Sequence, residues 1–190
     1  MEFYRRIPDE NIFLDKIGKY IVDIIVVIVI AVFISSYLCS EEKVTGNSMA
    51  SVLNSNEKVF VDTLSYNIFK PERYDVVKFS IKSKEGMEES YIKRIIGMPG
   101  ETVQIKEGKI YINGKELNYN KKKDRIVNAG AAADEIKLGK NEYFVMGDNW
   151  NSSEDSRFTS IGNVSVSDID GKVWLRISPF ARIGLVGKPK

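Results

Sequence analysis

Three short segments of this chain carry side chains suited to nucleophilic hydrolysis, and the first of them contains a serine. Ser48 lies in the segment Thr45-Gly46-Asn47-Ser48-Met49. Gly46 permits backbone conformations that other residues resist, and its missing side chain lets a substrate carbonyl approach. Ser48 is therefore a candidate nucleophile. A serine in such a segment is also typical of an ordinary turn, and the segment alone does not decide between the two.

The second segment supplies a candidate base, Lys93, within Tyr91-Ile92-Lys93-Arg94-Ile95. Strand periodicity places Lys93 on the same face as Tyr91 and Ile95, so its stem could pass over apolar surroundings. A free lysine amine has a pKa of about 10.4 and is almost fully protonated at pH 7, but burial can lower that pKa by several units. The alternative is an outward, solvated lysine, which this segment alone favours.

The third segment, residues 147–157, is dense in hydrogen-bonding side chains and follows an apolar strand pattern. Within it, Asp155 and Arg157 could form an ion pair, and Ser153 could hold a lysine amine in place. The alternative is a solvated polar loop.

The composition excludes several other kinds of site. The chain has no histidine, so no Ser-His-Asp triad can form within it. Cys39 is the only cysteine, which excludes an intrachain disulfide and a Cys/His zinc cage. Lysine and arginine number 28 against 26 acidic residues, a net charge of +2, and the short basic runs are typical of solvated surface. We therefore expect no nucleic-acid partner.

An apolar run at residues 20–39 predicts a membrane anchor. Asp23, near its start, is the one charged residue in the run. Twenty helical residues span about 30 Å, the thickness of a bilayer core. A cleaved signal peptide is the alternative, but its apolar core would be about 7–15 residues long and followed by a small-x-small cleavage site, which residues 36–40 do not provide.

The charges that flank this run predict its orientation. Basic residues precede the run and Glu41-Glu42-Lys43 follow it; the basic residues are Arg5, Arg6, Lys16 and Lys19. The positive-inside rule then places residues 1–19 in the cytoplasm and residues 40–190 outside. We expect a single-pass protein of the cell membrane with an extracytoplasmic domain.

Residues 40–190 are expected to form a mainly β domain, closer to a barrel or folded sheet than to a βαβ array. Asn113-Gly114 predicts a tight type I′ turn. Residues 115–141 are polar and weakly patterned. The predicted strands are 58–62, 75–79, 91–96, 102–106, 109–112, 142–146 and 173–177.

Taken in this order behind an N-terminal anchor, the three segments resemble the type I signal peptidases, most of all the shorter single-anchor form of Gram-positive bacteria. Residues 75–79 resemble a fourth segment of the family. The resemblance rests on Gly46-Asn47-Ser48-Met49, on Lys93 through Glu101, and on Gly147, Asp148, Asn149, Asp155, Ser156 and Arg157.

The resemblance implies a serine endopeptidase that removes signal peptides from secreted preproteins by cutting after a small residue. Ser48 would be the nucleophile and Lys93 the general base, with Ser153 positioning the lysine and Asp155 and Arg157 bracing the site. It further implies a β-rich catalytic core with an inserted region, for which residues 107–141 are the candidate, and no metal or organic cofactor. The implied partners are signal-peptide-bearing preproteins and the lipid bilayer; the sequence does not predict an oligomeric state.

Three residues depart from the family pattern. Ser51 and Val52 stand where the family usually has Pro and Thr, and Trp150 replaces the usual Arg after Gly-Asp-Asn. A proline would have constrained the turn near the nucleophile, and Trp150 could pack or lie at the membrane interface. The alternatives are a membrane-tethered β-domain that binds secretory chains with weak or no catalysis, and a Ser-Lys hydrolase of the self-cleaving repressor type, which an anchor fits poorly.

Overall fold

A computed structural model describes residues 10–82, 86–119 and 125–187. The chain divides into two compact units, residues 1–38 and 39–190. Helix α1 (Glu10–Leu38) belongs to the first unit, and strand β1 begins at Cys39, the last residue of the apolar run. The side chains described along α1, at residues 16–33, are exposed. Among the described residues, no helix combines the length and the apolar character needed to cross a membrane.

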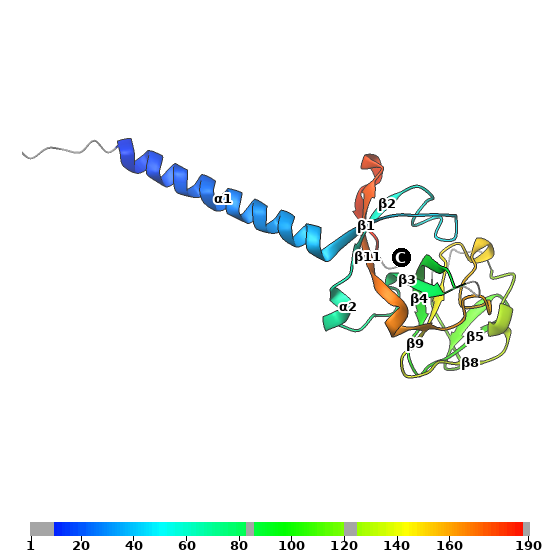
Figure 1. Cartoon of the computed structure of the whole chain (residues 1–190). Coiled ribbons are helices and arrows are strands. Elements are labelled where there is room, and N and C mark those ends of the chain that lie inside the picture. The colour runs from blue at the N-terminus through cyan, green and yellow to red at the C-terminus, as the bar shows by residue number, and fades with distance from the viewer. Residues whose placement is uncertain (1–9, 83–85, 120–124, 188–190) are drawn as a thin grey trace, which may run out of the picture. The chain divides into compact units, whose positions relative to one another are not determined.

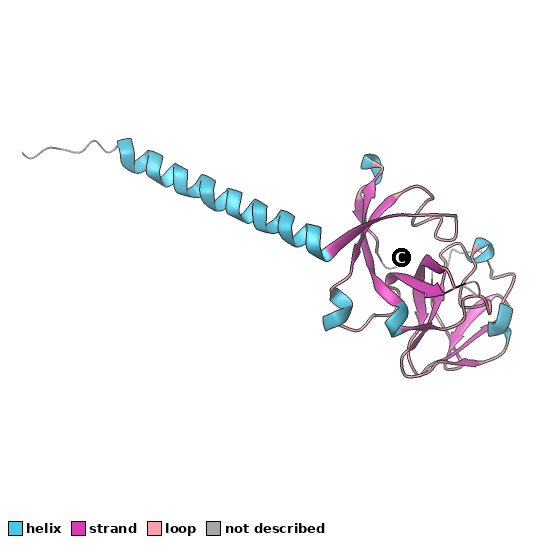
Figure 2. Cartoon of the chain, in the orientation of Figure 1, coloured by secondary structure: helices cyan, strands magenta, loops and turns pink. Residues whose placement is uncertain are grey.

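The second unit is built mainly from strands, as its sequence predicts (Figure 2). Its larger sheet is antiparallel, with the strand order β1-β2-β11-β3-β4-β9-β10, and β12 also pairs with β11. Strand β4, which carries Lys93, therefore lies inside the sheet between β3 and β9 (Figure 1). The strands are β1 (Cys39–Lys43), β2 (Lys58–Asp62), β3 (Val76–Lys82), β4 (Glu88–Gly97), β9 (Glu142–Met146), β10 (Val164–Ser165), β11 (Ile169–Ser178) and β12 (Gly184–Leu185).

A smaller antiparallel sheet, in the order β7-β6-β5-β8, lies between β4 and β9 in the chain. It begins at Thr102, five residues before the expected insertion at 107–141, because residues 102–106 form one of its inner strands. Asn113 and Gly114 have φ values of +51° and +76°, as the predicted type I′ turn requires. The strands are β5 (Thr102–Lys106), β6 (Lys109–Ile112), β7 (Lys115–Glu116) and β8 (Ile136–Lys137).

Apolar side chains on alternate positions of these strands form three buried clusters. One joins the smaller sheet to β4 and β9, with Val103, Ile110 and Phe144 as members. A second lies under the Ser48 loop and includes Met49 and Leu53, which are 1% and 0% exposed. The loop is therefore attached to the core directly beside its candidate nucleophile. The short helical elements are α2 (Ser65–Ile68) and the 3-10 turns η1 (Gly130–Ala133), η2 (Trp150–Ser152), η3 (Val166–Asp168) and η4 (Phe180–Arg182).

Candidate active site

The loop between β1 and β2 presents Ser48 at the surface of the second unit. Its two ends are joined by backbone hydrogen bonds in which Val44 N donates to Glu57 O and Asn56 N to Val44 O, both at 2.8 Å. Within the loop, Leu53 N donates to Met49 O at 2.8 Å. Ser48 is partly exposed, whereas its neighbour Met49 is buried. The loop thus holds a reachable hydroxyl on a backbone that is anchored on both sides.

Lys93 is buried, and this decides against the solvated lysine that its segment alone favours. The residue is 4% exposed and pairs with Val77 of β3 inside the sheet. Its Nζ lies 5.8 Å from the centroid of the Tyr91 ring, as strand periodicity predicts for that pair. Burial lowers the pKa of Lys93 from 10.5 to about 8, against the opposing charges of Asp155 and Glu154. A substantial fraction of the amine is therefore neutral near pH 8.

Ser48 and Lys93 line the same cavity, which has a volume of about 120 Å³. The first comes from the loop after β1 and the second from β4, 45 positions along the chain. Glu42, Lys78 and Ile92 line other parts of the wall. The fold thus brings the hydroxyl and the amine to one space large enough for a small substrate side chain.

The segment Gly147-Asp148-Asn149 contacts the loop that carries Ser48. Asn149 donates twice, from its backbone N to Ser48 O at 2.9 Å and from its side chain to Asn47 O at 3.1 Å. At Gly147, an added Cβ would come within 2.4 Å of Ser48 O and 2.2 Å of Ser153 Oγ. The glycine is therefore needed for close approach, and the amide of Asn149 fixes the backbone of Ser48. The resemblance in Gly147, Asp148 and Asn149 drew attention to this segment, but the sequence did not predict its contacts with Ser48 and Asn47.

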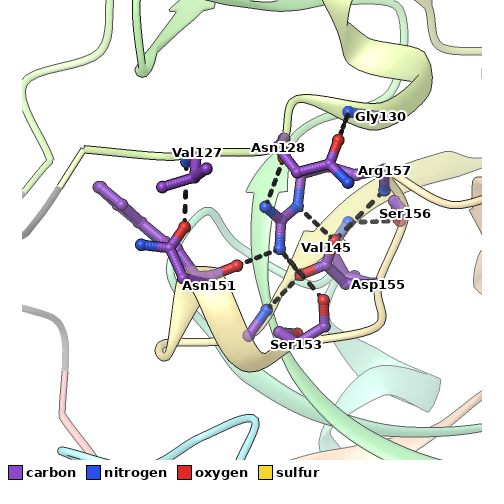
Figure 3. A network of polar contacts seen from close by, with 11 residues as sticks. Val127, Asn128, Gly130, Val145, Asn151, Ser153, Asp155, Ser156 and Arg157 are labelled. Carbon is purple, nitrogen blue, oxygen red and sulfur yellow. Dashed lines mark hydrogen bonds and ion pairs between the residues drawn. The ribbon is translucent and has the colours of Figure 1, made fainter.

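Asp155 and Arg157 form the ion pair that their spacing suggested, and both are buried. Arg157 donates from Nε to Asp155 Oδ1 at 2.8 Å and from Nη2 to Oδ2 at 2.9 Å, a two-point contact (Figure 3). The same guanidinium donates to the carbonyls of Asn128 and Trp150, while Gly147 N donates to Asp155 Oδ2 at 3.1 Å. The pair therefore ties the polar loop to the strand that ends at the site.

Ser153 takes part in this network through its backbone carbonyl, and its hydroxyl takes no part in it. The residue is 7% exposed, and its carbonyl accepts a hydrogen bond from Arg157 Nη2 at 3.2 Å. Within the described part of the chain, Ser153 Oγ is buried and has no hydrogen-bond partner. A hydroxyl in this state is able to accept a bond from an amine nearby. Its predicted contact with the Lys93 amine stays a prediction.

A second buried ion pair joins the lysine strand to the Gly-Asp-Asn segment, and sequence reasoning missed it. Arg94 donates from Nε to Asp148 Oδ1 at 2.9 Å and from Nη2 to Oδ2 at 2.6 Å; both side chains are almost fully buried. Burial acts to lower the pKa of Arg94, but the Asp148 carboxylate outweighs it and the pKa is raised. Tyr119, which follows β7 and belongs to the core cluster of the smaller sheet, also donates to Asp148 Oδ1, at 2.7 Å. An ion pair thus joins Arg94, the neighbour of Lys93, to Asp148, the neighbour of the Asn149 whose amide binds Ser48 O.

Each of the three residues that depart from the family pattern, Ser51, Val52 and Trp150, has a backbone conformation or a contact that the structure describes. Ser51 has a φ of +90°, a conformation that proline, with φ near −65°, cannot adopt. The carbonyl of Val52 accepts a hydrogen bond from Arg176 Nη1 at 2.7 Å. Trp150 stacks on Tyr119, with ring centroids 5.8 Å apart. The aromatic substitution is therefore packed against the region of the smaller sheet.

A β-rich domain in which a loop serine and a buried lysine share one cavity has the groups of a serine hydrolase whose base is lysine. Among the described residues, no group of three or more acidic or cysteine side chains is placed to hold a metal ion. The comparisons with known proteins agree with the enzyme class. The family model "Signal peptidase, peptidase S26" matches residues 17–178.

Individual relatives match over most of their length. A probable signal peptidase I-2 of Synechocystis sp. is 31% identical over 185 residues, which cover 94% of this chain and 79% of the relative. A signal peptidase I of Bacillus amyloliquefaciens is 36% identical over 167 residues, covering 84% and 87%. The crystal structure of a signal peptidase I from Enterococcus faecalis V583 is 31% identical, with a TM-score of 0.41, and covers 56% of this chain and 98% of that one. The chain belongs to the signal peptidase family, peptidase S26, a family of serine endopeptidases, which confirms the resemblance to type I signal peptidases.

Proposed function

We propose that this protein removes N-terminal signal peptides from secreted preproteins by cutting after a small residue, with Ser48 as nucleophile and Lys93 as general base. The observation that carries the proposal is a buried lysine, its pKa lowered to about 8, in the cavity that also contains Ser48. A protonated lysine cannot accept the hydroxyl proton, so the lowered pKa is what makes this base usable near neutral pH.

The reaction proceeds through an ester intermediate. Neutral Lys93 takes the proton of Ser48 Oγ as that oxygen attacks the carbonyl carbon of the scissile peptide bond, and the proton then passes to the leaving amine. Lys93 next takes a proton from water as the water oxygen attacks the ester carbonyl carbon. It returns that proton to Ser48 Oγ when the bond between Oγ and the carbonyl carbon breaks, which restores both residues. The backbone N–H of Ser48 stabilises the oxyanion, and the bond from Asn149 N to Ser48 O supports this role by fixing the loop backbone.

Three residues support this pair without reacting. Ser153 positions the lysine amine, for which its buried and unsatisfied hydroxyl is suited. Asp155 and Arg157 brace the polar loop through their two-point ion pair. The carboxylate of Asp155 also contributes a charge that opposes the lowering of the Lys93 pKa. The braced loop therefore influences both the position and the protonation of the base.

We further propose that residues 20–39 anchor the protein in the cell membrane as a single span, with residues 1–19 cytoplasmic and residues 40–190 outside. The described side chains of α1 from position 20 to 33 are exposed and, apart from Asp23 and Ala31, large and apolar, and basic residues precede the run. Residues 107–141, which contain β6, β7 and β8 of the smaller sheet, are proposed as an inserted subdomain of the catalytic part.

Cleavage by the detergent-solubilised full chain tests the proposed reaction. A precursor with an Ala-x-Ala site should be cut by wild type, while Ser48→Ala and Lys93→Met should lose cutting and keep the wild-type circular dichroism spectrum. Ser152→Ala and Lys106→Met, which change an exposed serine and an exposed lysine, serve as controls and should cut normally. Full activity in Lys93→Met would refute the assigned base. A wild type that binds precursor and never cuts it would favour the non-catalytic β-domain.

A further inference from the structure

An ion pair lies in the wall of the same cavity as the reactive side chains. Glu42 of β1 and Lys78 of β3 are in direct contact through Oε1 and Nζ. Both line the cavity that contains Ser48 and Lys93. Their side chains are 32% and 18% exposed, so the two charges face a partly solvated space. Neither residue has a role in the proposed reaction.

The position of this pair follows from the curvature of the larger sheet. Strands β2 and β11 lie between β1 and β3 in the sheet order, so the two charges belong to strands that do not pair with each other. For the two side chains to touch across the intervening strands, the sheet must curve so that β1 approaches β3. Along β3, Lys78 pairs with Ile92, next to the pair formed by Val77 and Lys93. Lys78 and Lys93 thus come from neighbouring positions on two paired strands, and both line the cavity.

The spacing of an extended peptide suggests which substrate residue meets the pair. In an extended strand, side chains two positions apart point to the same face and lie about 6.6 Å apart. When the residue before the scissile bond points toward Ser48 and Lys93, the side chain two positions earlier therefore points to the same face of the peptide. The cavity, of about 120 Å³, is lined by Glu42 and Lys78 as well as by Ser48 and Lys93. The pair is thus in reach of that second side chain.

This inference rests on the proposed function. We propose that the Glu42–Lys78 pair selects the substrate side chain two positions before the residue that precedes the cut, favouring small hydroxyl side chains over branched apolar ones. A valine or leucine there removes water from two charges and returns no hydrogen bond, which is unfavourable. A serine hydroxyl donates to the carboxylate or accepts from the ammonium. The pair therefore makes this part of the cavity polar.

A precursor series tests the selection. Four precursors differ at this single position, as alanine, serine, valine or lysine, and kcat/KM is measured for each with the full chain in detergent. We expect wild type to cut the serine precursor at least about tenfold better than the valine precursor. The double variant Glu42→Leu/Lys78→Leu should reverse that order by a similar factor. The single variant Lys78→Leu leaves the Glu42 carboxylate unpaired and should improve cutting of the lysine precursor.

Two controls separate selection from folding. The charge-swapped variant Glu42→Lys/Lys78→Glu keeps an ion pair and should keep the wild-type order of precursors. The variant Glu41→Leu/Lys58→Leu removes an exposed ion pair of 2.6 Å outside the cavity lining and should change no ratio. An unchanged order in the apolar double variant would overturn the inference. The inference would also be overturned if the apolar double variant changed the kcat/KM ratios equally for precursors that differ at the residue directly before the cut.

Binding separates this inference from the proposed function. The affinities of Ser48→Ala for the four precursors should follow the same order as the wild-type rates, and the order should reverse when Glu42→Leu and Lys78→Leu are added. If wild type cuts no precursor but the binding order holds, the proposed reaction fails and the selection by the pair stands. If wild type cuts and neither rates nor affinities change in the double variant, the reaction stands and the inference fails.

Discussion

Replacing Lys93 with methionine should abolish cleavage and make the folded protein more stable at neutral pH. Wild type buries a group that prefers to be charged, since folding lowers the pKa of Lys93 from 10.5 to about 8. A difference of this size corresponds to about 3 kcal/mol of unfolding free energy below pH 8. Methionine has a similar length and no charge, so Lys93→Met should recover most of that amount.

The sign of the pH dependence follows from the lowered pKa. Below pH 8 the lysine is protonated in both the folded and the unfolded chain, and the full penalty is present. Between pH 8 and 10.5 the unfolded chain binds the proton and the folded chain does not, so wild-type stability rises with pH relative to Lys93→Met. The advantage of the variant should therefore shrink by roughly 2 kcal/mol between pH 6 and pH 9.5.

Two measurements on the full chain in detergent test this reasoning. Urea unfolding, followed by tryptophan fluorescence at pH 6 and pH 9.5, gives the difference between wild type and Lys93→Met. The exposed Lys106→Met serves as the control for replacing any lysine. Wild-type kcat/KM should rise with pH to a half-maximum near 8, because only about 1% of the amine is neutral at pH 6. A variant no more stable than wild type at pH 6, or an activity unchanged from pH 6 to 9, would refute the lowered pKa.

Three further predictions concern other parts of the site. Removing one member of the buried Arg94–Asp148 pair, as in Arg94→Met or Asp148→Leu, should lower the unfolding free energy by about 3–5 kcal/mol, because the other charge stays buried without its partner. A loss below about 1 kcal/mol would contradict a buried ion pair between these two side chains. Gly147→Ala should lower kcat at least about tenfold by displacing the carbonyl of Ser48, the proposed nucleophile. Gly184→Ala, with open space around it, should leave kcat unchanged. Ser51→Gly should raise the thermal midpoint, with about 1 kcal/mol from relieving a φ of +90°, and an unchanged midpoint would contradict that strain.

Local pattern was sufficient to predict much of the β domain. The alternating segments 58–62 and 102–106 are strands with those bounds in the structure, because alternation of apolar and polar residues depends only on neighbours in the chain. Asn113-Gly114 forms its turn because both residues tolerate positive φ. The order of the motifs was also sufficient to predict the enzyme family, which the comparisons confirm.

Other features could not be predicted because they depend on contacts between distant segments. Nothing near Ser51 in the sequence indicates its positive φ. That residue belongs to a loop whose ends are joined by hydrogen bonds from Val44 to Glu57 and from Asn56 to Val44. The hydrogen bonds from Asn149 to the Ser48 loop join residues about 100 positions apart. Trp150 could have packed or lain at a membrane interface, and its stacking on Tyr119 depends on where the smaller-sheet region is placed.

Residue types and spacing thus determined which groups are available to this protein: a serine, a lysine and a polar loop, with no histidine to act as base. Only the tertiary structure decided whether the lysine was usable. Its own segment favoured an outward, charged side chain, and position inside the sheet between β3 and β9 buried it instead. The pKa of an amine depends on the water and charges around it, and the neighbours that supply them come from segments far apart in the chain.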